Sequence, residues 1–150
     1  MNDFPPRSPA AKVRGIVYIG RMLDKIRLHA EAKLPSEYQA NLGRKFDAHC
    51  ATFLHVDYDR LVARVLQGGS DDEIVDWCFA NGRQPSAEEI RVWNEFLRKR
   101  GWNDEITEIL TQRKHESGME DRGDICTMFD FIDADEGRPL TSDFAVEPQP

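Results

Sequence analysis

The fold class follows from one stretch near the start of the chain, Gly20-Arg-Met-Leu-Asp-Lys-Ile-Arg-Leu-His-Ala-Glu-Ala-Lys33. Together with Ile19, its apolar side chains recur every three or four residues, which places them on one face of an α-helix. These side chains are Ile19, Met22, Leu23, Ile26 and Ala30. The opposite face carries Asp24, Arg27 and Glu31. The spacing predicts an amphipathic helix that ends at Pro35 and packs its apolar face against a core.

Similar spacing predicts further helices, each with polar residues at its start or glycine at its end. They are a helix carrying Phe46, Cys50, Phe53 and Leu54; one capped by Asp57 or Asp59 that carries Leu61, Val62, Val65 and Leu66 and ends at Gly68-Gly69; one from Asn103 or Asp104 that carries Ile106, Ile109 and Leu110 and ends near Gly118; and one from Asp124 that carries Ile125, Met128, Phe129 and Ile132. Residues 34–44 are expected to form an ordered loop.

Two eight-residue segments, 70–77 and 86–93, share the pattern Ser-x-x-Glu-Ile-x-x-Trp. Each is a capping box, in which the serine side chain accepts a hydrogen bond from the N3 amide and the glutamate reaches back to the serine amide. Two copies are too few for a repeat protein, so the pattern predicts two helix starts. Trp77 and Trp93 are expected to anchor the core.

No segment shows the sustained alternation of apolar and polar residues that indicates a strand. Ser8-Pro9 is typical of a helix start, which predicts a short helix at residues 10–13. We therefore predict an all-α fold, a single-domain helical bundle of about six helices over residues 1–137. Residues 138–150 are expected to form a mobile acidic tail.

Charge is distributed unevenly along the chain. Residues 1–45 contain nine Lys or Arg and four Asp or Glu, a net charge of +5, which leaves −12 for the remainder of a chain whose formal net charge is −7. Nucleic-acid binders usually carry a basic total and a basic stripe, so this balance argues against nucleic acid as a partner. A local basic region can still hold a small anion or an acidic protein surface.

Composition also indicates where the chain resides. No apolar run approaches the roughly 18 residues that cross a bilayer, and the first residues lack the basic start and apolar region of a signal peptide. We expect a cytoplasmic protein with no membrane partner. The three cysteines, Cys50, Cys78 and Cys126, are widely separated and lie near apolar residues, which predicts reduced thiols rather than a disulfide framework.

Several motifs occur in a fixed order along residues 6–138. They are Arg7-Ser8-Pro9 with Lys12 and Gly15, Gly20-Arg21-x-x-Asp24-Lys25-x-Arg27, Glu37-Tyr38-x-x-Asn41, Gly69-Ser70-Asp71-x-Glu73, Ile90-x-x-Trp93-Asn94 and Asp124-Ile-x-x-x-Phe129-Asp130-x-x-Asp133-x-Asp135-Glu136-Gly137-Arg138. Their order resembles an uncharacterised bacterial family, the domain-of-unknown-function family 5069. The resemblance implies a small bacterial helical protein and supplies no mechanism.

The most chemically distinctive residues lie on the first long helix and the loop after it. The candidate ligand-binding residues are Arg21, Asp24, Lys25, Arg27, Tyr38 and Asn41. In one interpretation the cations face a cleft closed by the loop and bind a phosphate or carboxylate through charge-assisted hydrogen bonds. His29, one turn after Lys25, is then a candidate acid or base.

Two structural interpretations compete with this site. Arg21, Asp24, Arg27 and Glu31 lie three or four residues apart, which is typical of a solvent-exposed ladder of weak ion pairs. Alternatively, Asp24 forms a buried salt bridge that holds the loop in place. We favour the exposed ladder at this point.

Other chemistry finds little support in the sequence. The acidic segment that begins at Asp130 fails the EF-hand pattern. Counting from Asp133, Gly137 falls one place early and the twelfth position is Phe144. The histidines lack zinc spacing, and no phosphate loop or nucleophile elbow is present. We therefore predict no metal and no cofactor, and name no catalytic residue.

Two function classes remain open. One is a small helical binding or protein-interaction module, which we favour. The other is an enzyme or sensor that binds a small anionic metabolite in a charged cleft. Only the second class requires the candidate side chains to converge on one concave pocket. The oligomeric state is not specified by the sequence.

Overall fold

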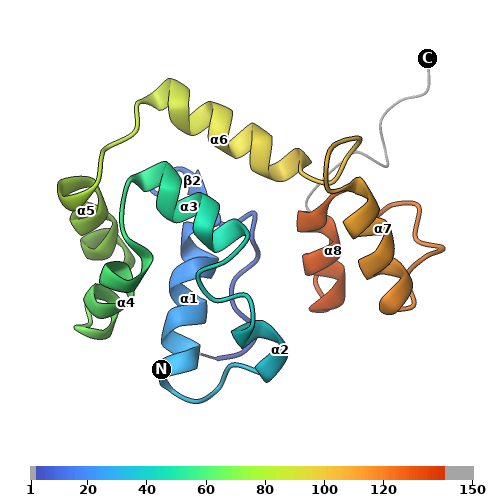
Figure 1. Ribbon diagram of the computed structural model, residues 1–150, viewed down its shortest axis with the longest axis horizontal. Coiled ribbons are helices and arrows are strands. Elements are labelled where there is room, and N and C mark those ends of the chain that lie inside the picture. The colour runs from blue at the N-terminus through green and yellow to red at the C-terminus, as the bar shows by residue number, and fades with distance from the viewer. Residues whose placement is uncertain (1–2, 141–150) are drawn as a thin grey trace.

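The computed structural model describes residues 3–140 and is mainly helical, as predicted (Figure 1). Eight helices and one small hairpin occur in this range, so the count of about six helices was low. The elements are β1 (Lys12–Val13), β2 (Ile16–Val17), α1 (Ile19–Ala30), α2 (Ser36–Gln39), α3 (Phe46–Leu54), α4 (Tyr58–Leu66), α5 (Asp71–Asn81), α6 (Ala87–Lys99), α7 (Thr107–Glu116) and α8 (Met128–Asp135). Residues 141–150, most of the predicted tail, lie outside this range.

Side-chain caps explain where several helices begin. Ser70 and Glu73 form the predicted capping box at α5, and Ser86 and Glu89 form the one at α6. At α4 the Asp57 carboxylate accepts a hydrogen bond from the amide of the third helical residue. Each cap satisfies an amide that has no partner within its helix, so these boundaries are local properties of the sequence.

The helix predicted at residues 10–13 is wrong, because this segment forms a hairpin. Lys12 and Val13 of β1 pair antiparallel with Val17 and Ile16 of β2. The two residues between the strands, Arg14 and Gly15, both have positive φ, at 55° and 78°. Positive φ at both central positions is the geometry of the tight turns that join paired strands. The chain therefore reverses where the Ser-Pro signal predicted a helix.

Three helix boundaries also differ from the prediction, and residues 34–44, expected to form a loop, contain the short helix α2. Helix α7 begins at Thr107 and not at Asn103 or Asp104, because the Asp104 carboxylate accepts hydrogen bonds from the amides of Gly101 and Ile106 in a turn before the helix.

The last helix begins at Met128 and not at Asp124, because the Thr127 hydroxyl accepts a hydrogen bond from the amide of Asp130 and caps α8 there. Asp124 instead pairs with Arg122 at 2.7 Å. The first long helix ends at Ala30, ahead of Pro35.

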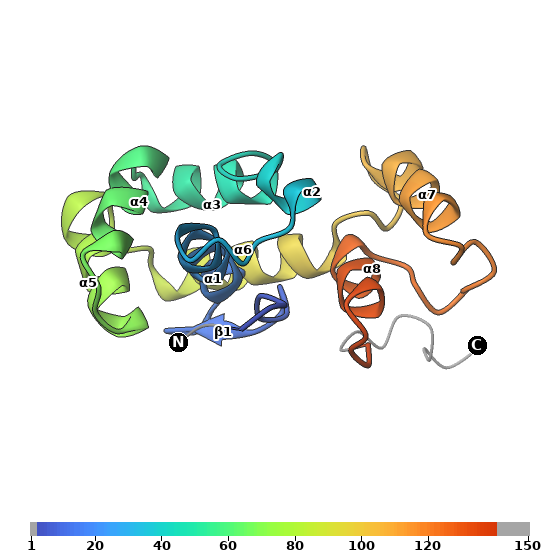
Figure 2. The same ribbon diagram turned by 90° about the horizontal axis from the view of Figure 1, so that it is seen from below.

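The helices enclose two groups of buried apolar residues. The larger core surrounds α1, which lies between α3 and α4 on one side and the hairpin on the other (Figure 2). Trp93 is buried there and stacks on Phe53 with ring centroids 4.6 Å apart, whereas Trp77 is only partly buried. A smaller core lies between α7 and α8. Phe46 packs against both cores, and α6 connects the two parts (Figure 1).

Two further observations concern the cysteines and the membrane, both of which the composition addressed. Cys50 and Cys78 are buried, Cys126 is partly buried, and all three are free thiols. Within residues 3–140, no helix combines the length and the apolar character required to span a membrane.

A close backbone contact fixes the end of α5 against the end of α3. A Cβ atom placed on Gly82 would lie 2.1 Å from the carbonyl oxygen of Leu54. The same oxygen accepts a hydrogen bond from the Arg83 amide at 2.9 Å. Because both partners are backbone atoms, the clash cannot be relieved by rotating a side chain.

Gly82→Ala is expected to lower the free energy of unfolding by about 3 kcal/mol, the upper part of the usual range for overpacking. Gly123→Ala is the matched control, because no atom lies within 4 Å of its added Cβ. Urea unfolding followed by circular dichroism measures both. Equal stability of the two variants would show that the Leu54 contact does not constrain the fold.

Candidate functional site

A cavity of about 370 Å³ lies where α1, α2 and the start of α3 face α7 and α8. This volume is at the lower end of the range for small-molecule sites. Because residues from both cores line it, the cavity exists only when the two parts of the fold are held together.

Two buried cations from α1 line the cavity, and each already has a carboxylate partner. Arg21 donates two parallel hydrogen bonds to Glu136, at 2.8 and 2.7 Å. Lys25 lies 2.9 Å from Asp47, which also accepts a hydrogen bond of 2.6 Å from the Tyr18 hydroxyl. Burial lowers the pKa of the Lys25 ammonium group, and the Asp47 carboxylate opposes this shift.

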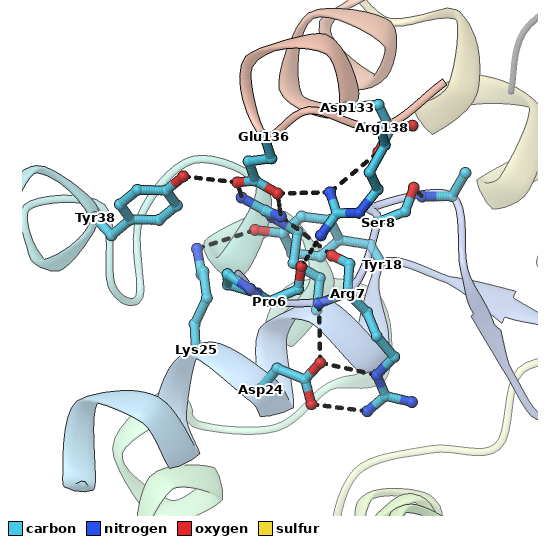
Figure 3. Close-up of polar contacts among 12 residues, drawn as sticks. Pro6, Arg7, Ser8, Tyr18, Asp24, Lys25, Tyr38, Asp133, Glu136 and Arg138 are labelled. Carbon is cyan, nitrogen blue, oxygen red and sulfur yellow. Dashed lines mark hydrogen bonds and ion pairs between the residues drawn. The ribbon is translucent and has the colours of Figure 1, made fainter. Parts of the chain in front are cut away.

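Glu136, Arg21, Tyr38 and Arg138 form a hydrogen-bonded group that we call the Glu136 cluster (Figure 3). The Tyr38 hydroxyl donates to Glu136 at 2.8 Å and Arg138 donates at 2.6 Å. The Glu136 side chain is 3% exposed. Burial alone would raise the pKa of its carboxyl group, but the hydrogen bonds from the three partners hold that pKa below its ordinary value. The cluster joins α1 and α2 to the end of α8.

The first residues after α8 continue this set of contacts. Arg138 also contacts Asp133, at 3.3 Å, and donates a hydrogen bond to the carbonyl oxygen of Pro6. The guanidinium group therefore links the segment after α8 to the N-terminal segment before the hairpin (Figure 3).

Four of the six candidate ligand-binding residues line the cavity: Arg21, Lys25, Tyr38 and Asn41. Asp24 and Arg27 do not. The Asp24 carboxylate pairs with Arg7 at 2.9 Å, and Arg27 pairs with Asp71 at 2.8 Å (Figure 3 shows the Asp24 contact).

The exposed ladder is the wrong description of α1. Arg21 is buried and pairs with a residue 115 positions away. Asp24 and Arg27 do approach each other, at 3.6 Å, but each has a shorter contact with another segment. The second interpretation, in which Asp24 forms a salt bridge, describes the structure better. Its partner is Arg7, however, so the salt bridge holds the N-terminal segment and not the loop at residues 34–44.

Four cations that the sequence analysis did not select also line the cavity, and one of them, Arg100, pairs with Asp104 at 3.3 Å. We call Arg44, Lys45 and Arg113 the cationic rim. Within residues 3–140, none of them forms an ion pair with a carboxylate. Burial and the charge of Arg113 both lower the pKa of the Lys45 ammonium group. Arg44 is the last residue of the loop predicted at residues 34–44, and Lys45 follows it directly, whereas no sequence motif surrounds Arg113.

The remaining lining is largely apolar. It comes from Phe46 of α3, from Ile109 of α7 and the adjoining Ile106, and from Phe131 and Ile132 of α8. Ile109 is 48% exposed, so part of this aliphatic surface is accessible to solvent. The site therefore combines an apolar wall with charged edges.

Backbone strain occurs at two residues that line the cavity. Tyr18, at the start of α1, has φ 77° and ψ −28°, and Lys45, at the start of α3, has φ 56° and ψ −121°. Positive φ is uncommon for residues with a Cβ atom, and such outliers cluster at functional sites. The hydrogen bond from Tyr18 to Asp47 helps to hold the first of them.

The structure also places the carboxylates and histidines that were considered for metal binding or acid–base chemistry. No group of three or more His, Cys, Asp or Glu side chains within residues 3–140 is placed to hold a metal ion. Asp133 is buried, and its carboxylate pairs with Arg138. His29 is exposed and does not line the cavity, whereas His49 does line it.

Glu136→Gln is expected to lower the free energy of unfolding at pH 7 by about 3–5 kcal/mol, because it leaves the buried Arg21 guanidinium without a charged partner. The pKa of Glu136 is lower in the folded state, so its contribution is present above the unfolded value of about 4.3 and is lost as pH falls through the folded pKa. The stability difference between the parent and this variant should therefore shrink in acid.

Urea unfolding at a series of pH values measures this difference. Glu88→Gln is the control, because it removes an exposed carboxylate that pairs with Arg91 and should change stability little. A loss that does not vary with pH, or one equal to that of the control, would contradict the role assigned to the Glu136 cluster.

Comparison with known proteins assigns most of the chain to one family. No curated protein matches the chain. A family model described as "Domain of unknown function (DUF5069)" matches residues 3–138, which include the eight helices and the hairpin of the described residues and all the residues of the cavity. The chain therefore belongs to the DUF5069 family.

Proposed function

We propose that this protein is a small binding module whose cavity holds an organic anion. The observation that carries the proposal is the cationic rim. Arg44, Lys45 and Arg113 line one cavity and have no carboxylate partner within residues 3–140, in a chain whose net charge is −7. The ligand class of this proposal comes from the second of the two classes that the sequence leaves open, a small anion in a charged cleft, because four candidate side chains converge on this cavity.

Electrostatics favours an anion at this position. Like charges held close together destabilise one another, and the lowered pKa of Lys45 beside Arg113 reflects this repulsion together with burial. A bound phosphate or carboxylate would reverse the repulsion and form charge-assisted hydrogen bonds with the same side chains. Arg21 and Lys25 are less available, because their charges are already paired. They serve to position the cavity wall.

The apolar wall favours an organic body over a bare inorganic ion. Ile106, Ile109 and Ile132 offer aliphatic surface next to the cationic rim. Removing such surface from water contributes roughly 25 cal/mol for each Å² that a ligand covers. An anion with a hydrocarbon part therefore uses both portions of the lining.

We also propose that the protein is a cytoplasmic bacterial protein that does not bind nucleic acid. Three free thiols fit a reducing compartment. The acidic total charge disfavours long polyphosphates, although a small anion can enter a locally basic cavity.

Isothermal titration with octanoate and with octyl phosphate tests the binding proposal. The parent should bind at least one of these probes more tightly than it binds acetate or inorganic phosphate. Arg113→Gln should weaken binding about ten-fold or more, the scale of one hydrogen bond to a charged group.

Arg60→Gln is the matched control, because it removes the same charge from α4 at a side chain that does not line the cavity and should leave affinity unchanged. Absence of binding to both probes, or equal affinity in the two variants, would reject the anion site.

A further inference from the structure

The cavity also has an acidic edge. Glu37 of α2 and Asp135 of α8 both line it, and we call these two residues the acidic pair. Within residues 3–140, neither carboxylate forms an ion pair with a cation. The neighbouring Glu136 differs, because Arg21 and Arg138 compensate its charge.

The two acidic side chains come from elements that the Glu136 cluster joins. The hydrogen bond of 2.8 Å between Tyr38 and Glu136 places α2 next to the end of α8, so the residues preceding these two, Glu37 and Asp135, lie near each other. Burial raises the pKa of the Asp135 carboxyl group, and the charges of Glu136 and Glu37 raise it further. A cation in this position would favour the ionised form of Asp135.

The cationic rim is separate from the acidic pair. It comes from the two residues before α3 and from the last turn of α7. The charged group that shifts the pKa of Lys45 is Arg113, and those that shift the pKa of Asp135 are both carboxylates. No ion pair links the two sets within residues 3–140. Opposite charges therefore face one cavity without neutralising each other.

Helix α8 indicates the length of the cavity. Its first residue, Met128, and its last residue, Asp135, both line the cavity. At 1.5 Å per residue, these ends are separated by about 10 Å along the helix axis. Phe131 and Ile132 supply apolar lining between them.

We infer that the ligand is a zwitterion, with an anionic group at the cationic rim, an ammonium group at the acidic pair and an apolar chain between them. This inference rests on the proposed function and adds the second charge. A simple anion would leave the acidic pair uncompensated, and a dianion spanning the cavity would be repelled by it. The α8 lining of about 10 Å favours a ligand with a spacer between its two charges, whereas the charged groups of an ordinary α-amino acid are attached to one carbon.

Three probes with the same number of carbon atoms test the inference by isothermal titration at pH 7: 8-aminooctanoate, octanoate and octylamine. The zwitterion should bind the parent about ten-fold more tightly than octanoate does, the scale of one charge-assisted contact. Octylamine should bind more weakly than either. The short zwitterion 4-aminobutyrate should show no advantage over butyrate, because it cannot reach both edges.

Asp135→Asn should remove the advantage of 8-aminooctanoate and leave octanoate bound at least as tightly as in the parent. Asp135 is exposed and has no ion-pair partner within residues 3–140, so the variant should fold. Asp121→Asn is the control, since this exposed carboxylate does not line the cavity.

The outcomes separate the two proposals. Octanoate binding that depends on Arg113, without any advantage of 8-aminooctanoate, overturns the zwitterion and leaves the anion site standing. If Asp135→Asn still binds 8-aminooctanoate more tightly than octanoate, the assignment of the ammonium group to the acidic pair is also overturned. Absence of binding by every probe rejects both proposals. Loss of the advantage in Asp135→Asn alone supports the zwitterion.

Discussion

The buried ion pair between Arg21 and Glu136 is the interaction on which the rest of the site depends. Moving two charges out of water is costly, and the arrangement is favourable only when good geometry and further hydrogen bonds compensate for lost hydration. Here the guanidinium group binds both carboxylate oxygens, and Tyr38 and Arg138 donate to the same carboxylate. Because these donors come from α1, α2 and the segment after α8, one carboxylate holds together the walls of the cavity.

Helix α1 uses its charged side chains on two sides. Arg21 and Lys25 line the cavity, whereas Asp24 and Arg27 contact Arg7 and Asp71 on segments outside it. Each charge on this helix therefore meets a partner from elsewhere in the fold. This explains how a helix with several charged residues is so extensively buried, since burial of paired charges avoids most of the penalty for isolated ones.

In the cavity, unlike on α1, several charged side chains have no partner of opposite charge within residues 3–140. These side chains are the cationic rim and the acidic pair. The ion pairs of Arg21 and Lys25 hold the walls of the cavity in place. The cationic rim and the acidic pair line the same cavity beside its apolar wall. The strained backbone at Tyr18 and Lys45 lies at the same place. The buried charges of α1 are all paired, whereas the charges of the cationic rim and the acidic pair are left for a ligand to compensate. This difference is the basis for proposing a binding module.

The sequence by itself determined the helical class, most helix positions and their caps, because apolar periodicity and capping are local: Ser70 and Glu73 are three residues apart. It missed the hairpin, whose turn at Arg14 and Gly15 depends on backbone angles that the strong Ser8-Pro9 signal obscured. It selected Arg21 and Tyr38 but not their shared partner Glu136, 115 residues from Arg21. Only tertiary structure decided which charges are paired and which line the cavity, because that depends on how α7 and α8 dock against α1 and α2, and helical periodicity carries no information about distant partners.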